Sequence, residues 1–336
     1  MRTAILLCGL VGLMADTSLA DEHPPKNAVT QEADMPHLNV PMKTLGGRQF
    51  WGDVLFFHEY RIQRNVFTGH YRLLNGKDVR LAWGTLDECR QKLDQERTEL
   101  KLPPMQGKAV ILLHGITRSS KHMTKFREPF EKAGYSVFAM DYPSTRGTIQ
   151  ESAEYLQQVI SNMQGITEIN FVVHSMGGLV VRTYLREHAP RDPRIHRMVM
   201  IGSPNNGANL ANLLSDNLNS VFKPIFGPAG QQLVVDAEGY IAKLPKPDFE
   251  FAVIAGGRGE EKGFNPLIPG DDDGIVSVES TRLPGAVDFM LVSSGIEATH
   301  TFLPAAPIVI ESGVRFIQTG ALRADGKKSP ILEPAQ

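Results

Sequence analysis

The chain has 336 residues, of which 42% are hydrophobic and 21% are charged, a composition typical of a globular protein. Its 35 Lys and Arg residues nearly balance 37 Asp and Glu residues, so the chain lacks the basic excess of a nucleic-acid-binding protein. We therefore expect no nucleic-acid partner. The length allows either two domains or one large domain with an appendage.

The first twenty residues are typical of an export signal. Arg2 precedes an apolar run over residues 4–14, which is too short to span a membrane, and Ser18-Leu19-Ala20 has small residues at the two positions that a signal peptidase reads. We expect residues 1–20 to be a cleaved signal peptide, and the protein to be periplasmic or extracellular. The next segment, 21–46, combines prolines with polar residues and is predicted to be a tether.

Residues 47–104 are predicted to form a small N-terminal appendage of strands and one helix. Aromatic and β-branched residues are concentrated in 54–57 and again in 66–74, which favours two short strands. Apolar residues at helical spacing then predict a helix over residues 85–100. No catalytic constellation is visible in this segment.

The sequence contains two cysteines, and their positions predict no disulfide after export. Cys8 lies in the predicted signal peptide, which leaves Cys89 as a single thiol. Thr85 and Glu88 form a capping-box pair at the start of the predicted helix that carries Cys89. Because nothing nearby in sequence would lower its pKa, we expect Cys89 to be a buried structural thiol.

Residues 105–320 show the alternation of short apolar runs and amphipathic helices that predicts an α/β fold with a mostly parallel sheet flanked by helices. The expected strands are 109–113, 135–140, 169–173, 198–201, 251–255 and 289–292. Thr148 and Glu151 should cap a helix that continues to Met163. The polar, proline-containing segment 321–336 is predicted to be a flexible tail.

The strongest chemical signal is the sequence from Phe171 to Val181. An apolar strand leads into His174-Ser175-Met176, and the small residues Gly177 and Gly178 then begin a helix. This pattern holds a serine hydroxyl on a tight strand-to-helix turn, the nucleophile elbow that α/β-hydrolases use. The first glycine of the G-x-S-x-G pattern is absent, because Val173 occupies that position. Ser175 could alternatively act only as a helix cap.

A serine nucleophile needs a base within hydrogen-bonding distance, and the chain order of the α/β-hydrolases places that base last. Among the ten histidines, seven precede Ser175, namely His23, His37, His58, His70, His114, His122 and His174. His188 and His196 follow the serine too closely. His300, in a loop before the last predicted helix, is therefore the expected base.

The acid that orients the base should lie between the serine and His300 in the chain. Asp271, Asp272 and Asp273 follow the strand predicted over residues 251–255. We expect Asp273 to be the acid, because it adjoins a turn glycine and the apolar pair Ile275-Val276, and Asp272 is the second choice. If all three are unconnected surface acids, Glu279 or Asp288 would orient the base.

Acyl transfer also needs hydrogen-bond donors directed at the oxyanion. The backbone N–H of Met176, at a helix N-terminus, is well placed by sequence. The second donor is expected from Ile116, because Gly115 lets the loop after the first strand approach the substrate. His114 is expected to brace this loop.

Residues 205–249 interrupt the α/β alternation and are predicted to be a cap or lid insertion. Apolar residues recur at helical spacing between Leu210 and Phe222, opposite a polar face. This helix could cover an acyl pocket as a lid or be packed permanently on the sheet. As a lid it would make transient contact with a lipid surface.

Over residues 105–320 the sequence resembles the α/β-hydrolase superfamily, and within it bacterial lipases and esterases with H-G-[IL] in the oxyanion loop and H-S-M-G-G at the elbow. The resemblance implies that Ser175 is the nucleophile, Asp273 the acid and His300 the base, with Ile116 and Met176 as oxyanion donors. It implies no metal and no organic cofactor.

The sequence therefore predicts an exported serine hydrolase that cleaves small-molecule or lipid carboxylic esters through an acyl-enzyme. An acyltransferase, a thioesterase or an amidase would use the same triad, and a non-catalytic hydrolase-like binding protein is a third alternative. Dehalogenase and epoxide hydrolase chemistry is disfavoured, because those relatives carry Asp where this chain has Ser175. Oligomeric state is not defined by the sequence.

Overall fold

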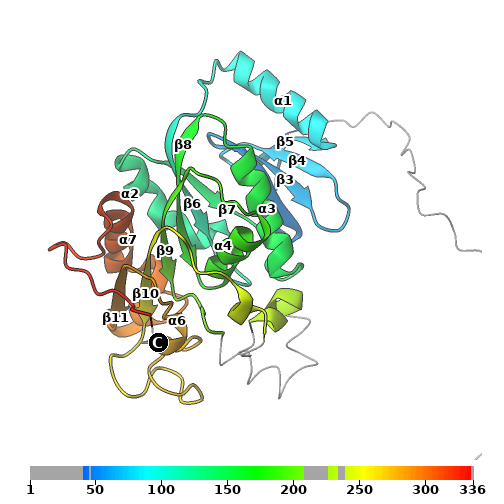
Figure 1. The fold of residues 1–336 in the computed structure, drawn as a ribbon. Coiled ribbons are helices and arrows are strands. Elements are labelled where there is room, and N and C mark those ends of the chain that lie inside the picture. Colours follow the sequence, from blue (N-terminus) through cyan, green and yellow to red (C-terminus); the bar gives the residue numbers. More distant parts are fainter. Residues whose placement is uncertain (1–40, 45–46, 208–225, 234–238, 334–336) are drawn as a thin grey trace, which may run out of the picture. The chain divides into compact units, whose positions relative to one another are not determined.

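The computed structural model describes residues 41–44, 47–207, 226–233 and 239–333 (Figure 1). The predicted signal peptide, nearly all of the predicted tether and much of the predicted cap, including residues 208–225, lie outside the described residues. The fold can be followed through the remaining segments.

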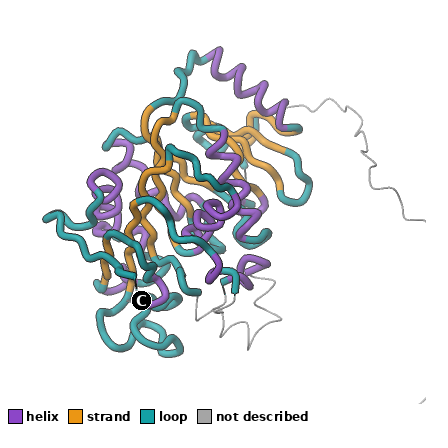
Figure 2. The backbone as a smooth tube through the Cα atoms, viewed as in Figure 1, coloured by secondary structure: helices purple, strands orange, loops and turns teal. Residues whose placement is uncertain are grey.

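Six parallel strands form a central sheet in the order β11-β10-β9-β8-β6-β7. Their bounds are β6 (Gly107–Leu113), β7 (Ser136–Met140), β8 (Ile166–His174), β9 (Ile195–Ile201), β10 (Glu250–Gly256) and β11 (Asp288–Val292). All six expected strands are present, and the predicted mostly parallel sheet is confirmed. Figure 2 shows these strands (orange) lying between helices (purple).

Helices cover both faces of the central sheet. The helices α3 (Ile149–Ser161) and α4 (Met176–Glu187) lie on one face, and α2 (Arg127–Lys132) and α7 (Pro307–Thr319) lie on the other (Figure 1). A further short helix, α6 (Val278–Thr281), follows β10.

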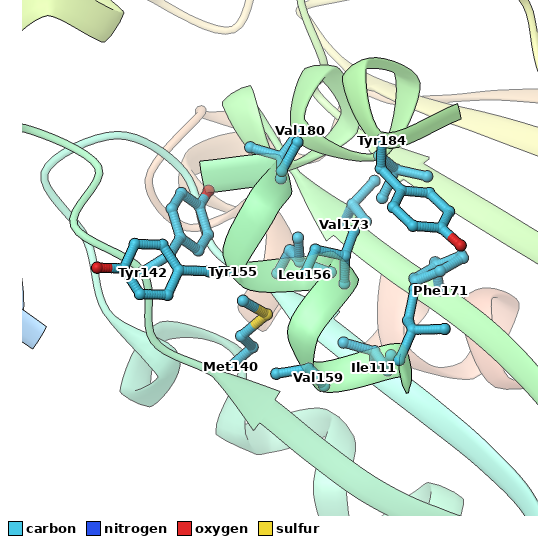
Figure 3. Packing of buried hydrophobic residues seen from close by; sticks show 14 of the residues in the cluster. Ile111, Met140, Tyr142, Tyr155, Leu156, Val159, Phe171, Val173, Val180 and Tyr184 are labelled. Carbon is cyan, nitrogen blue, oxygen red and sulfur yellow. The ribbon is translucent and has the colours of Figure 1, made fainter. Parts of the chain in front are cut away.

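The central strand β6 illustrates why its sequence is a continuous apolar run. Successive side chains of a strand point to opposite faces. Ile111 packs into the cluster formed with α3 and α4, which includes Leu156 and Val180 (Figure 3), whereas Leu112 packs into the cluster formed with α2 and α7. Because both faces are buried, no polar residue alternates with them.

Both predicted capping boxes are present. The amide of Glu151 donates to Thr148 Oγ1 and the amide of Thr148 donates to Glu151 Oε2, at 3.1 and 2.6 Å, which begins α3. Thr85 and Glu88 make the same exchange at the start of α1 (Leu86–Glu99). Each pair satisfies two amides that have no partner within the helix.

The chain before residue 105, called the N-terminal segment from here on, forms a second, five-stranded antiparallel sheet in the order β1-β5-β4-β3-β2. Its strands are β1 (Met42–Lys43), β2 (Trp51–Phe57), β3 (Tyr60–Asn65), β4 (Tyr71–Leu74) and β5 (Val79–Gly84). Residues 66 and 67, predicted to begin a strand, instead form a turn. The cause is the side chain of Asn65, whose Oδ1 accepts hydrogen bonds from the amides of Phe67 and Thr68.

This sheet, the predicted N-terminal appendage, shares a hydrophobic core with the segment from residue 105 onward. The ring centroids of Phe56 and Phe138 lie 5.3 Å apart, and β2 packs on α3. The amide of Asp53 donates to the carbonyl oxygen of Asp141 at 2.9 Å. Cys89 is fully buried, as predicted, and burial raises the pKa of its thiol to about 12.

The predicted flexible tail is wrong for residues 321–333, which pack on the domain. The amide of Ile331 donates to Ala286 O at 2.9 Å, and Arg323 forms an ion pair with the fully buried Asp288 at 2.8 Å. Leu322 is also fully buried. The burial of Leu322, the ion pair and the backbone hydrogen bond hold this segment on the domain, although its polar and proline-containing sequence favours a flexible tail.

Candidate active site

Ser175 lies on a strained turn between β8 and α4. Its φ of 55° and ψ of −125° place a non-glycine residue in a region that L-residues rarely occupy, which is how an elbow exposes its serine. A Cβ on Gly177 would lie 3.0 Å from the Leu113 carbonyl oxygen, so the helix can approach β6 closely only without a side chain there. Val173, which replaces the usual glycine, is fully buried in the core.

Ser175, His300 and Asp273 form one hydrogen-bonded chain. His300 Nε2 lies 3.0 Å from Ser175 Oγ, and His300 Nδ1 lies 2.6 Å from Asp273 Oδ2. All three residues are at least nine-tenths buried, at 5%, 6% and 1% exposure respectively. The Nδ1 proton therefore belongs to the bond with the carboxylate, which leaves the Nε2 lone pair facing the serine hydroxyl.

The Asp273 carboxylate is held by its own loop. Its Oδ1 accepts hydrogen bonds from the amides of Ile275 and Val276 at 3.0 and 2.8 Å, and its backbone carbonyl accepts one from the amide of His300 at 2.8 Å. The apolar pair next to this aspartate thus orients it, as its sequence position suggested.

The structure separates the other candidate acids from His300. Asp272 Oδ1 accepts from the amides of Asn265 and Gly274, so this side chain holds the loop rather than the histidine. Burial raises the pKa of Asp272 above its ordinary value. Glu279 pairs with Arg282, and Asp288 binds the segment after α7.

The loop after β6 passes directly beside the serine. A Cβ on Gly115 would lie 2.9 Å from Ser175 Cβ and 3.4 Å from its Oγ, so only glycine leaves this space open. Ile116 follows on the same loop. Met176 is the first residue of α4, whose initial amides have no acceptor within the helix. Gly115 and Met176 are thus immediate neighbours of Ser175, and the roles of Ile116 and Met176 as oxyanion donors stay a prediction.

Two buried histidines brace this arrangement. His174 Nε2 donates to the backbone carbonyl of His300 at 3.0 Å, and its ring lies 4.7 Å from the His300 ring. Burial lowers the pKa of His174 well below its ordinary value, which keeps the ring neutral. His114, stacked on Tyr142 at 4.2 Å, donates from Nδ1 to Gly115 O at 2.7 Å, in agreement with its expected bracing role.

Sequence reasoning missed Gln49, which connects the N-terminal segment to the loop of Ile116. Gln49 Nε2 donates to Arg118 O at 2.5 Å, and its Oε1 accepts from Ser144 Oγ at 3.0 Å and from the amide and hydroxyl of Thr145 at 3.1 Å each. Ser144 Oγ in turn accepts from the amide of Thr117 at 3.1 Å. The contacts of Gln49 join residues 69 to 96 positions apart, and no local pattern reports them.

A buried ion cluster lies beneath the same loop. Asp141 Oδ1 accepts from the amide of Ser120 at 2.7 Å, while its other oxygen pairs with Arg48 and Arg61. These guanidinium groups outweigh burial and hold the pKa of Asp141 below its ordinary value. The neighbouring Asp53 is fully buried, and burial raises its pKa to about 7 despite Arg61 at 3.9 Å.

The described parts of the predicted cap pack on the helices of one face. Residues 226–232 are helical, and Gln232 Oε1 accepts from the amide of Ile149 at 2.8 Å. Arg182 donates to the carbonyls of Leu244 and Pro245, and burial lowers the pKa of this arginine to about 10.

Among the described residues, no group of three or more His, Cys, Asp or Glu side chains could hold a metal ion. Within the same residues, no helix has the length and apolar character needed to cross a bilayer.

The central sheet has the strand order described above, and a strained turn after β8 carries Ser175. The hydrogen-bonded residues follow one another in the chain order Ser175, Asp273, His300, which is the order found in the α/β-hydrolase fold. The chain has an α/β-hydrolase fold. A family model described as a domain of unknown function, DUF7379, matches residues 77–226 of this chain. Among curated proteins, none matches the sequence.

Solved structures similar to this chain include three at low sequence identity. The lin2722 gene product of Listeria innocua is 21% identical, with 68% of this chain and 98% of that chain covered and a TM-score of 0.46. The mature Bacillus licheniformis lipase BlEst2 is 21% identical, with 65% and 92% covered and a TM-score of 0.46. Aspergillus fumigatus lipase B is 14% identical, with 67% and 54% covered and a TM-score of 0.46.

Proposed function

We propose that this protein is an exported serine hydrolase that cleaves carboxylic esters through a covalent acyl-enzyme. The observation that carries the proposal is the buried chain from Ser175 Oγ through His300 to Asp273, with contacts of 3.0 and 2.6 Å. This is the arrangement by which a base activates a weak nucleophile and an acid orients that base.

In the proposed first step, Ser175 Oγ forms a bond to the ester carbonyl carbon while its proton passes to His300 Nε2. The carbonyl oxygen becomes an oxyanion, which the N–H groups of Ile116 and Met176 stabilise. The tetrahedral intermediate then expels the alcohol, which takes the proton from His300. Asp273 stabilises the imidazolium that exists between these transfers and remains ionised.

In the second half of the reaction, His300 removes a proton from water, and the hydroxide forms a bond to the acyl carbon. Collapse of the second intermediate releases the carboxylic acid and returns the proton to Ser175 Oγ. His174 supports both halves by holding the His300 backbone, because its Nε2 donates to that carbonyl at 3.0 Å.

Labelling with a fluorophosphonate, together with hydrolysis of 4-nitrophenyl esters from acetate to palmitate, tests this proposal. Wild-type protein should be labelled and active, and Ser175→Ala should lose both properties. Ser203→Ala is a matched control, because Ser203 is a buried serine beside the elbow. Ser203 makes no hydrogen bond to Ser175, His300 or Asp273 in the described part of the structure. It should keep both properties.

Labelling that persists in Ser175→Ala would overturn the assignment of the nucleophile. Folded wild-type protein that is neither labelled nor active would contradict the hydrolase proposal and favour a binding protein. Export is tested separately, by determining the N-terminal residue of the mature protein after expression in a Gram-negative host. Cleavage after Ala20 is expected, and retention of residues 1–20 would contradict export.

A further inference from the structure

A cleft of about 690 Å³ lies beside the loop that carries Ile116. One wall is formed by residues 47–50 of the N-terminal segment, and the other by residues 117–119, 121, 122, 145 and 146. The cleft therefore exists only because the N-terminal segment packs against the catalytic segment.

Positive charge is concentrated in this cleft. Arg118, Lys121 and Arg146 line it, all three are exposed, and no Asp or Glu lies among the lining residues. None of the three forms an ion pair with any residue in the described part of the chain, although many surface cations do, such as Lys132 with Glu128. Three like charges in one concavity repel each other and attract an anion.

Two other basic residues line the cleft but add little free charge. Arg48 is already paired with Asp78 and Asp141. Burial and the nearby Arg118 lower the pKa of His122 to about 4, so this ring is neutral near pH 7. The unneutralised charge is thus that of the three exposed cations.

The cleft adjoins the reacting groups. Arg118 Nη2 donates to Thr301 Oγ1 at 3.0 Å, one residue beyond His300. The ring of His122 lies 5.2 Å from the ring of His174, which itself lies 4.7 Å from that of His300. Thr117 follows directly after Ile116. An ester positioned at Ser175 can therefore extend a second group of the same molecule into this cleft.

We infer that the cleft binds an anionic group, a phosphate or a carboxylate, carried by the ester substrate. The inference rests on the proposed function and names its substrate class: an ester with a negative charge close to the scissile bond. Arg118 and Arg146 supply planar guanidinium donors suited to such an anion, and Lys121 adds a point charge.

The test compares two esters that differ only in the anion, 1-butyrylglycerol and 1-butyrylglycerol 3-phosphate. Wild-type protein should hydrolyse the phosphate ester with the higher kcat/KM, and added NaCl should reduce the difference. The double variant Lys121→Gln/Arg146→Gln should lower the ratio of the two kcat/KM values by about five- to tenfold, since each exposed pair contributes modestly. Arg118 is left in place because of its bond to Thr301.

The matched control is Arg90→Gln/Lys101→Gln, which removes the same charge at exposed positions on and just after α1. Its ratio should equal that of wild-type protein. Equal kcat/KM for both esters in wild-type protein, or an equal fall in the ratio for both double variants, would overturn the inference.

A binding measurement distinguishes failure of the proposed function from failure of this inference. Calorimetric titration of Ser175→Ala with 1-butyrylglycerol 3-phosphate needs no turnover, and binding weakened by Lys121→Gln/Arg146→Gln supports the cleft even if no ester is hydrolysed. Absence of binding overturns the inference. Hydrolysis of phosphatidylglycerol in preference to phosphatidylcholine in mixed micelles would assign the anion to a lipid headgroup. Hydrolysis of 1-butyrylglycerol 3-phosphate without hydrolysis of either phospholipid would assign it to a soluble ester, and a preference for phosphatidylcholine would overturn the inference.

Discussion

Gln49 is expected to control activity although it lies in the N-terminal segment, outside the region that resembles hydrolases. Substitution of Gln49 by Ala removes one hydrogen bond to Arg118 and three from Ser144 and Thr145. The Ser144 hydroxyl, which accepts a hydrogen bond from the amide of Thr117 next to Ile116, then loses the acceptor that fixes its orientation. The perturbation therefore acts on the backbone of the proposed oxyanion loop.

The magnitude follows from the number and exposure of these bonds. Four hydrogen bonds at ~0.5 to 1.5 kcal/mol each would total ~2 to 6 kcal/mol if they were independent and fully buried. Gln49 is only partly buried, so water replaces some of them and we expect a loss of ~1 to 3 kcal/mol in the unfolding free energy. Loss of a whole oxyanion donor costs about 10²- to 10³-fold in kcat, so a displaced loop should cost about 10- to 100-fold.

The assay is steady-state hydrolysis of 4-nitrophenyl butyrate, combined with urea unfolding of the same preparations. Gln49→Ala should lower kcat and leave KM nearly unchanged, because the oxyanion donors act mainly in the transition state. Gln91→Ala, on the exposed side of α1, is the matched control and should resemble wild-type protein. If Gln49→Ala loses unfolding free energy but keeps its kcat, the segment only stabilises the fold and the reasoning is refuted.

Three further outcomes are expected. Asp273→Asn should lower kcat by about ten-thousandfold, as does loss of the acid in a comparable triad, whereas Asp272→Asn should mainly reduce the unfolding free energy. Similar kcat values in the two variants would contradict this assignment. Gly115→Ala should slow fluorophosphonate labelling of Ser175, since the new Cβ would lie 2.9 Å from the serine Cβ, and wild-type labelling kinetics would show that this space is unused. Asp53 has a folded-state pKa of about 7, above its ordinary 3.8, so its contribution to stability is lost as pH rises through this interval. Urea unfolding of Asp53→Asn should therefore show a gain relative to wild-type protein as pH rises from about 4 to about 7, and a pH-independent difference would contradict the raised pKa.

Local sequence patterns predicted the central sheet well, for a physical reason. Each strand of a parallel sheet is buried on both faces, so strands such as β6 appear as uninterrupted apolar runs bounded by turns. The capping boxes at Thr85 and Thr148 are also local, because all of their partners lie within three residues. Such elements need no knowledge of distant contacts.

The predictions that failed concern segments whose state depends on distant partners. Residues 321–333 are polar and contain prolines, yet Asp288 and Ala286 hold them on the domain. The strand expected to begin at residue 66 is replaced by a turn, because Asn65 Oδ1 accepts hydrogen bonds from the amides of Phe67 and Thr68 that compete with strand pairing.

By itself, the sequence determined the α/β class, the order of the strands along the chain, the buried thiol of Cys89 and a short list of chemically suitable residues. Chain order reduced the candidate bases to His300, and loop chemistry favoured Asp273 over Asp272. These conclusions depend on periodicity and on residue types, which a linear sequence preserves.

Only the tertiary structure decided which of these groups meet. The contact between Ser175 and His300 joins residues 125 positions apart, and that between His300 and Asp273 joins residues 27 apart. The packing of Gln49 on the loop of Ile116, and the basic cleft between them, arise from two segments whose sequences show no mutual pattern. Long-range hydrogen bonds and charge clusters depend on three-dimensional proximity, so they become visible only when the fold brings distant residues together.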